Sequence, residues 1–278
     1  TMRPPAKRAP MLYVLAIGVS DYQDDDWELS YAAKDARDLI EMFRRNRGLY
    51  RGVQLRLLLD EDATRSAILG TRSFLQRAKA DDGVVVFFAG RAQLDAKLNY
   101  TLATYDSERG APQRGGLSLH ALEGLLSGLE TRRKVVLLNT THFNETTSNR
   151  FQHRTSDSIT VRGRSLARAS DTNTLTPSDY TAVLGELFAD FHQRRGAVVL
   201  ASASGWEIGA ESRAWNNSVF THALFDGLQS RRADTNADGQ VTAQELRTFV
   251  ALRISSLTQG RQTLTSRHPR LPFDLPLH

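Results

Sequence analysis

Two stretches of the sequence combine residue types that could carry chemistry. The first is DTNADGQVTAQE, residues 234–245, which matches the EF-hand calcium pattern D-x-[DN]-x-[DN]-G-x5-E at every specified position. Hard oxygen donors at this spacing favour Ca²⁺ over zinc or copper. The expected ligands are Asp234, Asn236, Asp238, the carbonyl of Gln240, Thr242 directly or through water, and Glu245 in a bidentate mode. The alternative is a helix–helix turn that binds no ion at cellular calcium levels, because a single unpaired loop can be weak.

The second stretch is VVLLNTTHFN, residues 135–144, an apolar run that ends in polar side chains. In open α/β sheets, sites form at the carboxyl ends of the strands. Thr141 is a poor nucleophile unless a base lies beside it. Its neighbour His142 points to the opposite face if the strand is still extended. A hydrolase built on Thr141 would therefore need His142, or a base brought in by another segment.

Short apolar runs recur along the chain and are typical of buried strands. They are MLYVLAIGV (11–19), VQLRLLL (53–59), VVVFFAG (84–90), YTLATY (100–105), KVVLLN (134–139) and AVVLASA (197–203). Amphipathic segments lie between them, and the expected helix caps are Ser30, Thr64, Ser118 and Ser178. Alternation of apolar strands with helices predicts an α/β fold, a mostly parallel sheet of about six strands between helices.

Composition narrows the classes of function. The 278 residues contain no cysteine, which excludes disulfides, thiolate metal sites and a cysteine nucleophile. No apolar run approaches the ~20 residues of a membrane span, so we expect no membrane association. The net charge of +5 is spread over many segments without an aromatic–basic motif, so we do not expect a nucleic-acid partner. A cytoplasmic location is favoured, because no signal peptide is recognised.

We expect one large domain. The opening segment 1–10 has three prolines and reads as a linker, and residues 11–278 form the domain. Residues 144–178 are rich in Ser, Thr, Arg and Asn, which predicts a long mobile loop. An amphipathic helix follows from Tyr180 to Phe191.

The order of these blocks resembles that of the caspase-like peptidases, in particular the bacterial, metacaspase-related kind. The blocks are YVLAIGVSDYQ, LSYAAKDARDL, DDGVVVFFAGR, RKVVLLNTTH, AVVLASASGWEIGAES and FTHALFDGL, followed by the acidic glycine-containing loop. The resemblance covers about residues 11–275. It implies a caspase-like three-layer fold, and the family often carries an acidic loop at this place.

In that family, a histidine after the third strand is the general base and a cysteine after the fourth is the nucleophile. The matching positions here are Arg91 and Thr141, whose separation agrees with the roughly fifty residues between caspase His and Cys. A guanidinium stays protonated and has no acceptor lone pair, so Arg91 cannot be a base. The resemblance therefore implies an inactive member, a pseudoenzyme that does not cleave its own 144–178 loop.

Other family positions suggest a remnant of the substrate pocket. Asn139 stands where an acidic residue would help bind a basic side chain of the substrate, and Phe143 with Asn144 replaces a small Ser-Gly pair. The resemblance also implies that Trp206 and Glu211 form part of one groove wall, with His142 at the strand end. The pocket is expected to be neutralised and crowded.

We expect a non-catalytic domain that binds a protein or peptide partner or scaffolds a larger protein, with calcium as a structural ligand. Arg91 could pair with a carboxylate of an acidic peptide, since a guanidinium prefers bidentate pairing. Alternatively, Arg91 and Thr141 are surface polar residues without a role. The rival from the enzyme class is a residual or altered hydrolase that uses Thr141. The partner's identity and the oligomeric state stay open.

Overall fold

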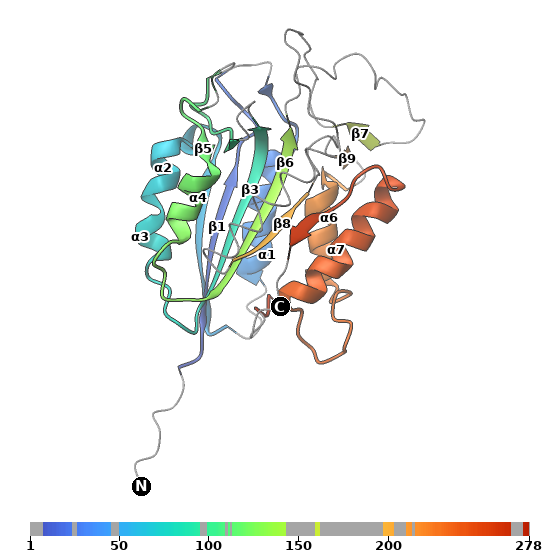
Figure 1. Ribbon diagram of the computed structural model, residues 1–278. Coiled ribbons are helices and arrows are strands. Elements are labelled where there is room, and N and C mark those ends of the chain that lie inside the picture. The colour runs from blue at the N-terminus through green and yellow to red at the C-terminus, as the bar shows by residue number, and fades with distance from the viewer. Residues whose placement is uncertain are drawn as a thin grey trace.

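The structure of the protein is a computed structural model (Figure 1). It describes residues 8–23, 27–45, 50–94, 99–108, 111, 113–142, 159–161, 197–202, 210–212, 215–267 and 275–277. The expected loop at 144–178, apart from residues 159–161, and the expected helix at 180–191 lie outside them.

The central element is a mixed sheet in which most strands are parallel, as the sequence predicts. Its main path runs β11-β8-β6-β3-β1-β2, and β11 is antiparallel to β8. The strands are β1 (Met11–Gly18), β2 (Gly52–Leu59), β3 (Gly83–Leu94), β6 (Arg133–His142), β8 (Ala197–Ala201) and β11 (Thr265–Arg267). The short strands β4 (Tyr100–Leu102) and β5 (Leu117–Ser118) extend the sheet from the carboxyl end of β3.

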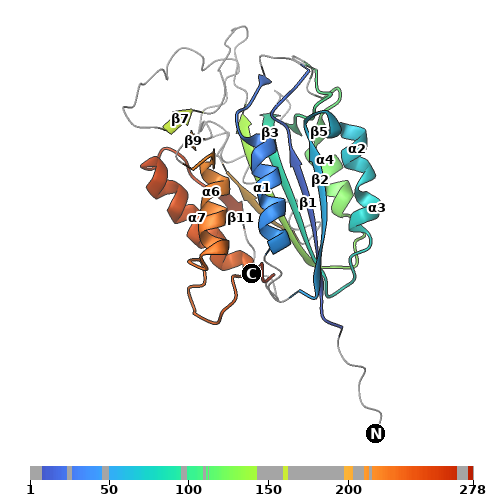
Figure 2. The same cartoon turned by 180° about the vertical axis from the view of Figure 1, so that it is seen from behind.

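Helices cover both faces of the sheet. Helix α1 (Ala32–Arg45) lies on the face opposite α4 (Leu119–Leu126), as Figures 1 and 2 show from the two sides. The other helices are α2 (Arg65–Gly70), α3 (Arg72–Leu75), α6 (Val219–Gln229) and α7 (Ala243–Thr258), with a short 3₁₀ turn η2 at Asp60–Asp62. Helices α6 and α7 pack against each other, and α6 also contacts α1.

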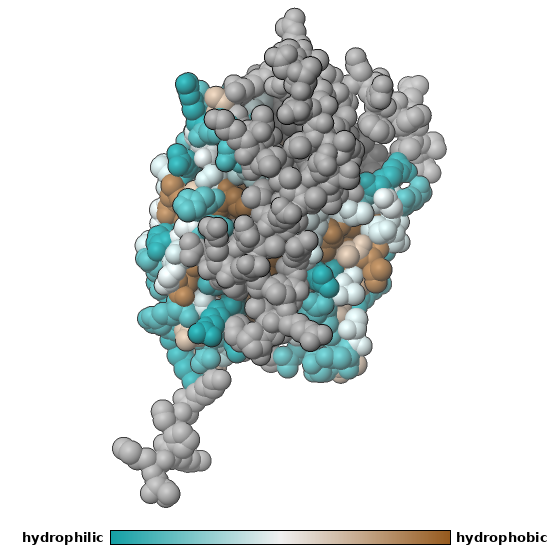
Figure 3. All heavy atoms as spheres, viewed as in Figure 1, coloured by the Kyte–Doolittle hydropathy of each residue, from teal (hydrophilic) through white to brown (hydrophobic). Residues whose placement is uncertain are grey.

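The core forms because the parallel strands are apolar on both sides and buried on both sides. Residues 84–89 of β3 and 135–138 of β6 are buried, and so are 12–17 of β1. Helix α1 approaches β1 closely at Gly18, where an added Cβ would lie 2.5 Å from the Ala32 carbonyl oxygen. Figure 3 shows apolar residues scattered among hydrophilic ones on the described part of one face. No helix among the described residues is long and apolar enough to cross a membrane.

Local sequence signals account for several boundaries. Thr64 and Ser118 cap α2 and α4, as expected, through hydroxyls that accept backbone N–H groups. The expected single helix after Thr64 is instead divided at Thr71 into α2 and α3. At α1, the hydroxyl that accepts the Ala33 N–H (2.9 Å) comes from Ser20 in the preceding loop, not from the expected cap Ser30.

One part of the fold does not follow from hydrophobic periodicity. A separate three-stranded sheet has the order β10-β9-β7, with β7 at Ile159–Val161, β9 at Ala210–Ser212 and β10 at Asn217–Ser218. Each strand has only two or three residues, and β9 and β10 are largely polar. Such strands are held by pairing between distant segments, which leaves no periodic pattern to recognise.

Candidate functional site

Arg91 and Thr141, the two residues that the family resemblance places at the dyad positions, lie side by side at the carboxyl end of the sheet. Strands β3 and β6 are parallel, and their register pairs Arg91 with Thr141. Paired residues of neighbouring parallel strands point to the same face, and so do residues two apart on one strand. Asn139, Thr141 and Arg91 therefore share the face that carries α1 and α6.

Arg91 is buried rather than solvated, since only 3% of the residue is exposed. Its Nε donates to the carbonyl oxygen of Trp27 at 2.7 Å, and an Nη nitrogen donates to the carbonyl of Glu28 at 3.4 Å. Its backbone N–H donates to the Tyr22 hydroxyl at 2.8 Å. The Tyr22 and Trp27 rings pack edge to face, with centroids 5.5 Å apart. The guanidinium thus fastens the segment before α1 to the end of β3.

This arrangement corrects one expectation for Arg91 and weighs against another. A surface residue without a role is wrong, because the side chain is buried and hydrogen-bonded to backbone carbonyls. A peptide carboxylate would have to reach a guanidinium that is buried and whose Nε already donates to the Trp27 carbonyl. Sequence reasoning could not foresee these partners, since they lie more than sixty residues away along the chain.

Thr141 is also 3% exposed, so the surface alternative is wrong for this residue too. Its Oγ1 is buried and has no hydrogen-bond partner among the described residues. The backbone of β6 remains extended through His142, which pairs with Ala92. The His142 side chain lies outside the described set. The described residues supply no base to the Thr141 hydroxyl.

Asn139 lies at the centre of a buried polar cluster instead of lining an open pocket. Its Nδ2 is 2.8 Å from Asp35 Oδ2, 2.8 Å from Ser218 Oγ and 3.4 Å from Thr221 Oγ1. Asp35 Oδ1 accepts from Asn217 Nδ2 at 3.0 Å and from the Ser218 N–H at 3.2 Å. The cluster joins α1, β6, β10 and the first turn of α6.

Asp35 is the residue that sequence reasoning missed. It is fully buried, although aspartate is seldom buried without partners. The signal was present in YAAKDARDL, where Asp35 interrupts the apolar stripe of Ala32, Ala36 and Leu39 on α1. The carboxylate lies near the N-terminus of α6, where a negative charge is favourable.

The opposite face of β6 carries a second polar contact. The hydroxyls of Tyr100 and Thr140 are 3.1 Å apart, and the Thr140 N–H donates to Ser202 Oγ at 3.2 Å. Burial raises the pKa of the Tyr100 phenol well above its ordinary value, although the contact with Thr140 acts in the opposite direction. Tyr100 therefore stays neutral and serves as a hydrogen-bonding group.

Of the two remaining groove residues, the structure describes only the backbone of Glu211. Trp206 lies outside the described residues. Glu211 belongs to β9, and its backbone pairs with Thr160 and Ser218, while its side chain is not described. Nearby, the Trp215 ring stacks on the His222 ring at 4.9 Å, and burial lowers the pKa of His222.

The acidic loop 234–245 folds back on itself. Both carboxylate oxygens of Asp234 accept loop N–H groups, from Asp238 at 3.2 Å and from Gly239 at 2.9 Å. Gly239 has a φ of +83°, which is the sharp turn expected at this position. Glu245 Oε1 accepts from the Thr235 N–H at 3.1 Å, so the last expected ligand reaches the start of the loop.

The exit of the loop is a helix cap. Thr242 caps α7, and its hydroxyl and N–H both contact Glu245 Oε2, at 2.8 and 3.0 Å. Burial raises the pKa of Glu245, but the hydrogen bonds from Thr242 and Thr235 outweigh it, so this pKa lies below its ordinary value. Within the described residues, no three His, Cys, Asp or Glu side chains converge as a group that could hold a metal. The loop thus has the expected residues and the expected turn, but the carboxylates of Asp234 and Glu245 accept hydrogen bonds from backbone N–H groups of the loop.

Together, the sheet order, the helices on both faces and the paired strand ends define an α/β protein of the caspase-like class. The chain belongs to the caspase-domain family, since the model of that family matches residues 11–272. A solved structure, protein GSU0716 from Geobacter sulfurreducens, is similar in fold, with a TM-score of 0.61 and 14% identity over 95% of each chain. No curated protein sequence matches the chain.

Proposed function

We propose that this caspase-like domain is a pseudoenzyme that acts by binding a protein or peptide partner or by scaffolding. The proposal rests mainly on Arg91, which occupies the position of the family's general base and is buried and hydrogen-bonded to backbone carbonyls. A general base must accept a proton, and a guanidinium has no acceptor lone pair. Its hydrogen bonds to the carbonyls of Trp27 and Glu28 give it a structural task instead.

The nucleophile position supports the same conclusion. A threonine hydroxyl attacks a carbonyl only if a neighbouring group takes its proton. Thr141 Oγ1 is buried and makes no hydrogen bond within the described part of the chain. Its described neighbours on this face of β3 and β6 are Arg91, which cannot accept a proton, and Asn139, whose amide nitrogen donates to Asp35.

The rival function is an altered hydrolase in which a base from outside the described residues serves Thr141. Mass spectrometry of a mixed peptide library incubated with the purified protein, with and without calcium, separates the two. We expect no cleavage under either condition, and an unchanged intact mass of the protein itself. Cleavage that disappears in Thr141→Val, but persists in the control Thr140→Val, would establish the hydrolase.

We propose further that the loop 234–245 binds Ca²⁺ as a structural ligand of the domain. The donor set is all oxygen, and the loop is closed by the Thr235 N–H, which donates to Glu245, and by the Gly239 N–H, which donates to Asp234. Asp234, Asn236, Asp238, the Gln240 carbonyl and Glu245 would hold the ion. Thr242 would contribute through water, because its hydroxyl is engaged in the cap of α7.

Calcium binding is tested by thermal unfolding with and without the ion. An ion that binds only the folded state raises the melting temperature. At a free calcium concentration of about 100 times Kd, the free energy of unfolding increases by about 2.7 kcal/mol. Asp234→Ala should abolish that gain, whereas Asp226→Ala, outside the loop, should leave the difference made by calcium in place. No shift in the wild-type protein would mean that the loop is a turn without an ion.

A further inference from the structure

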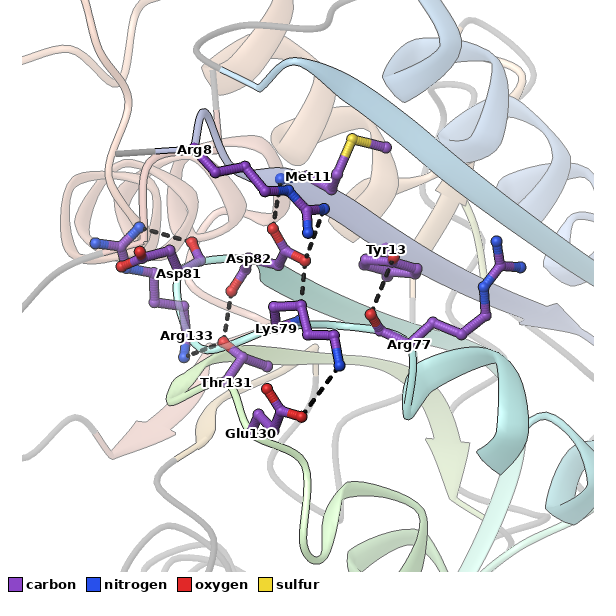
Figure 4. A network of polar contacts seen from close by, with 10 residues as sticks. All are labelled: Arg8, Met11, Tyr13, Arg77, Lys79, Asp81, Asp82, Glu130, Thr131 and Arg133. Atoms are coloured by element: carbon purple, nitrogen blue, oxygen red, sulfur yellow. Dashed lines mark hydrogen bonds and ion pairs between the residues drawn. The ribbon is translucent and has the colours of Figure 1, made fainter. Parts of the chain in front are cut away.

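The opposite, amino end of the sheet holds a dense polar network that the site does not use (Figure 4). Asp82 precedes β3 and is almost fully buried. Its carboxylate accepts the N–H of Met11, the first residue of β1, at 2.7 Å and the N–H of Lys79 at 2.9 Å. The same carboxylate pairs with Arg8 at 3.7 Å. Asp82 thereby joins the start of β1, with the segment before it, to the start of β3.

Residues 275–277 connect the acidic loop to this end of the sheet. They lie antiparallel to Val241–Ala243, the exit of the loop, with Thr242 opposite Pro276. The Ala243 N–H donates to the Leu275 carbonyl at 3.0 Å, and the Leu277 N–H donates to the Val241 carbonyl at 2.7 Å. The side chains of Leu275 and Leu277 are buried. We call residues 275–277 the strap.

Tyr50 fastens the other side of the strap. Its hydroxyl donates to the Pro276 carbonyl at 2.8 Å. A Cβ added to Gly83, at the start of β3, would lie within 2.9 Å of Tyr50, Leu12 and Leu275, so the four residues meet in one tightly packed place. Burial raises the pKa of the Tyr50 phenol, while the Arg133 guanidinium lowers it and Asp82 raises it. The phenol is a proton donor at any ordinary pH, within electrostatic reach of the Asp82 network.

Glu245 connects the strap to the rest of the loop. One carboxylate oxygen holds the loop's first half through the N–H groups of Thr235 and Asn236, at 3.1 and 3.4 Å. The other oxygen holds the N–H of Thr242 at 3.0 Å, in the middle of the three residues that pair with the strap. A change at the loop can therefore reach Tyr50 through Glu245 and Thr242, then through the backbone hydrogen bonds of Val241 and Ala243 to the strap, and finally through the Pro276 carbonyl.

We propose that the strap couples the state of the acidic loop to the amino end of the sheet, where the segment before β1 enters, and not to the Arg91–Thr141 end. The identity of the signal, calcium, rests on the function proposed above, whereas the coupling itself rests on the contacts. Docking of the strap is then the two-state element, and both the loop and Tyr50 stabilise the docked state.

The test is native-state hydrogen exchange at the Leu277 and Met11 amides, read by NMR, in the whole chain. Tyr50→Phe removes one hydrogen bond and should accelerate exchange at Leu277 by about five-fold. Glu245→Ala, which frees both halves of the loop, should accelerate exchange at Leu277 and Met11 by at least as much. Thr248→Ala is the matched control, because Thr248 is an exposed residue of α7 whose hydroxyl donates to the Gln244 carbonyl of the same helix, and it should change neither amide.

Calcium chloride is the second probe, with binding measured independently by calorimetry. Coupling predicts that a bound ion slows exchange at Leu277 in the wild-type protein. If calorimetry detects no binding but Glu245→Ala still accelerates exchange at Leu277 and Met11, the calcium proposal fails and the strap stands. If calcium binds, but neither the ion nor Glu245→Ala alters these amides, the strap is wrong. If Glu245→Ala does not fold, the test is made with Tyr50→Phe. Unchanged exchange of the Leu277 amide in that variant overturns the proposal.

Discussion

Asn139 and Thr141 lie two residues apart on the same face of β6, and both are buried. They differ in whether their polar side-chain atoms are hydrogen-bonded. The Asn139 amide nitrogen has three oxygen neighbours, whereas the Thr141 hydroxyl has no hydrogen-bond partner among the described residues. Burial is therefore not what separates them. The difference is that Asn139 faces α1 and α6, which supply polar groups, while the neighbour of Thr141 on β3 is Arg91, whose donors are directed to Trp27 and Glu28.

Two buried polar residues at one strand end can therefore differ in how far the fold uses them. One position has been absorbed into the framework of the fold. The other keeps a polar atom in a place where nothing described satisfies it, at a cost of about 1–3 kcal/mol. Three substitutions along this strand end and its neighbour test that contrast.

The largest effect is expected from Asn139→Asp. The new carboxylate replaces a donor that lies 2.8 Å from Asp35, so two buried acids would face each other. We expect a loss of about 3–5 kcal/mol in the free energy of unfolding at pH 7. Urea unfolding measures it.

The loss at Asn139→Asp should depend on pH. Repulsion raises the pKa of the pair in the folded state above the unfolded value of about 3.9, so the folded state binds an extra proton between the two values. By linkage, stability then falls as the pH rises, and the deficit relative to wild type shrinks from pH 7 to pH 5. A deficit independent of pH would show that the substituted side chain does not face Asp35.

A smaller effect is expected from Arg91→Met, which retains an apolar stem but removes the donors to the carbonyls of Trp27 and Glu28. Hydrogen bonds from charged groups contribute about 1.5–3 kcal/mol, so we expect a loss of about 2 kcal/mol and a change in the fluorescence of Trp27. Arg91→Lys keeps the charge and should recover only part of the loss. If Arg91→Met were neutral, the side chain would have no structural task.

The smallest effect has the opposite sign. Thr141→Val removes a buried hydroxyl that has no partner and should stabilise the protein by about 1 kcal/mol. The matched control is the neighbouring Thr140→Val, which removes a hydroxyl that contacts Tyr100 at 3.1 Å and should destabilise it. Equal destabilisation by both substitutions, measured by urea unfolding, would mean that Thr141 does have a partner in solution.

The sequence by itself determined a great deal of this protein. Runs of apolar residues bounded by helical stripes sufficed for the α/β fold, because strand periodicity and burial are local properties. The absence of cysteine sufficed to exclude a cysteine nucleophile, because this depends on residue type alone. The helix caps at Thr64 and Ser118 could likewise be predicted from a few adjacent residues.

Only the tertiary structure decided what the strand-end residues do. Asn139 meets Asp35 across 104 positions and Arg91 meets Trp27 across 64, while Tyr50 meets Pro276 across 226. No local pattern encodes such contacts, since each is created when separate elements pack and a buried polar group must find a partner. The same reason explains why Asp35 was missed and why the strap could not be foreseen: their partners become neighbours only once the sheet and its helices have assembled.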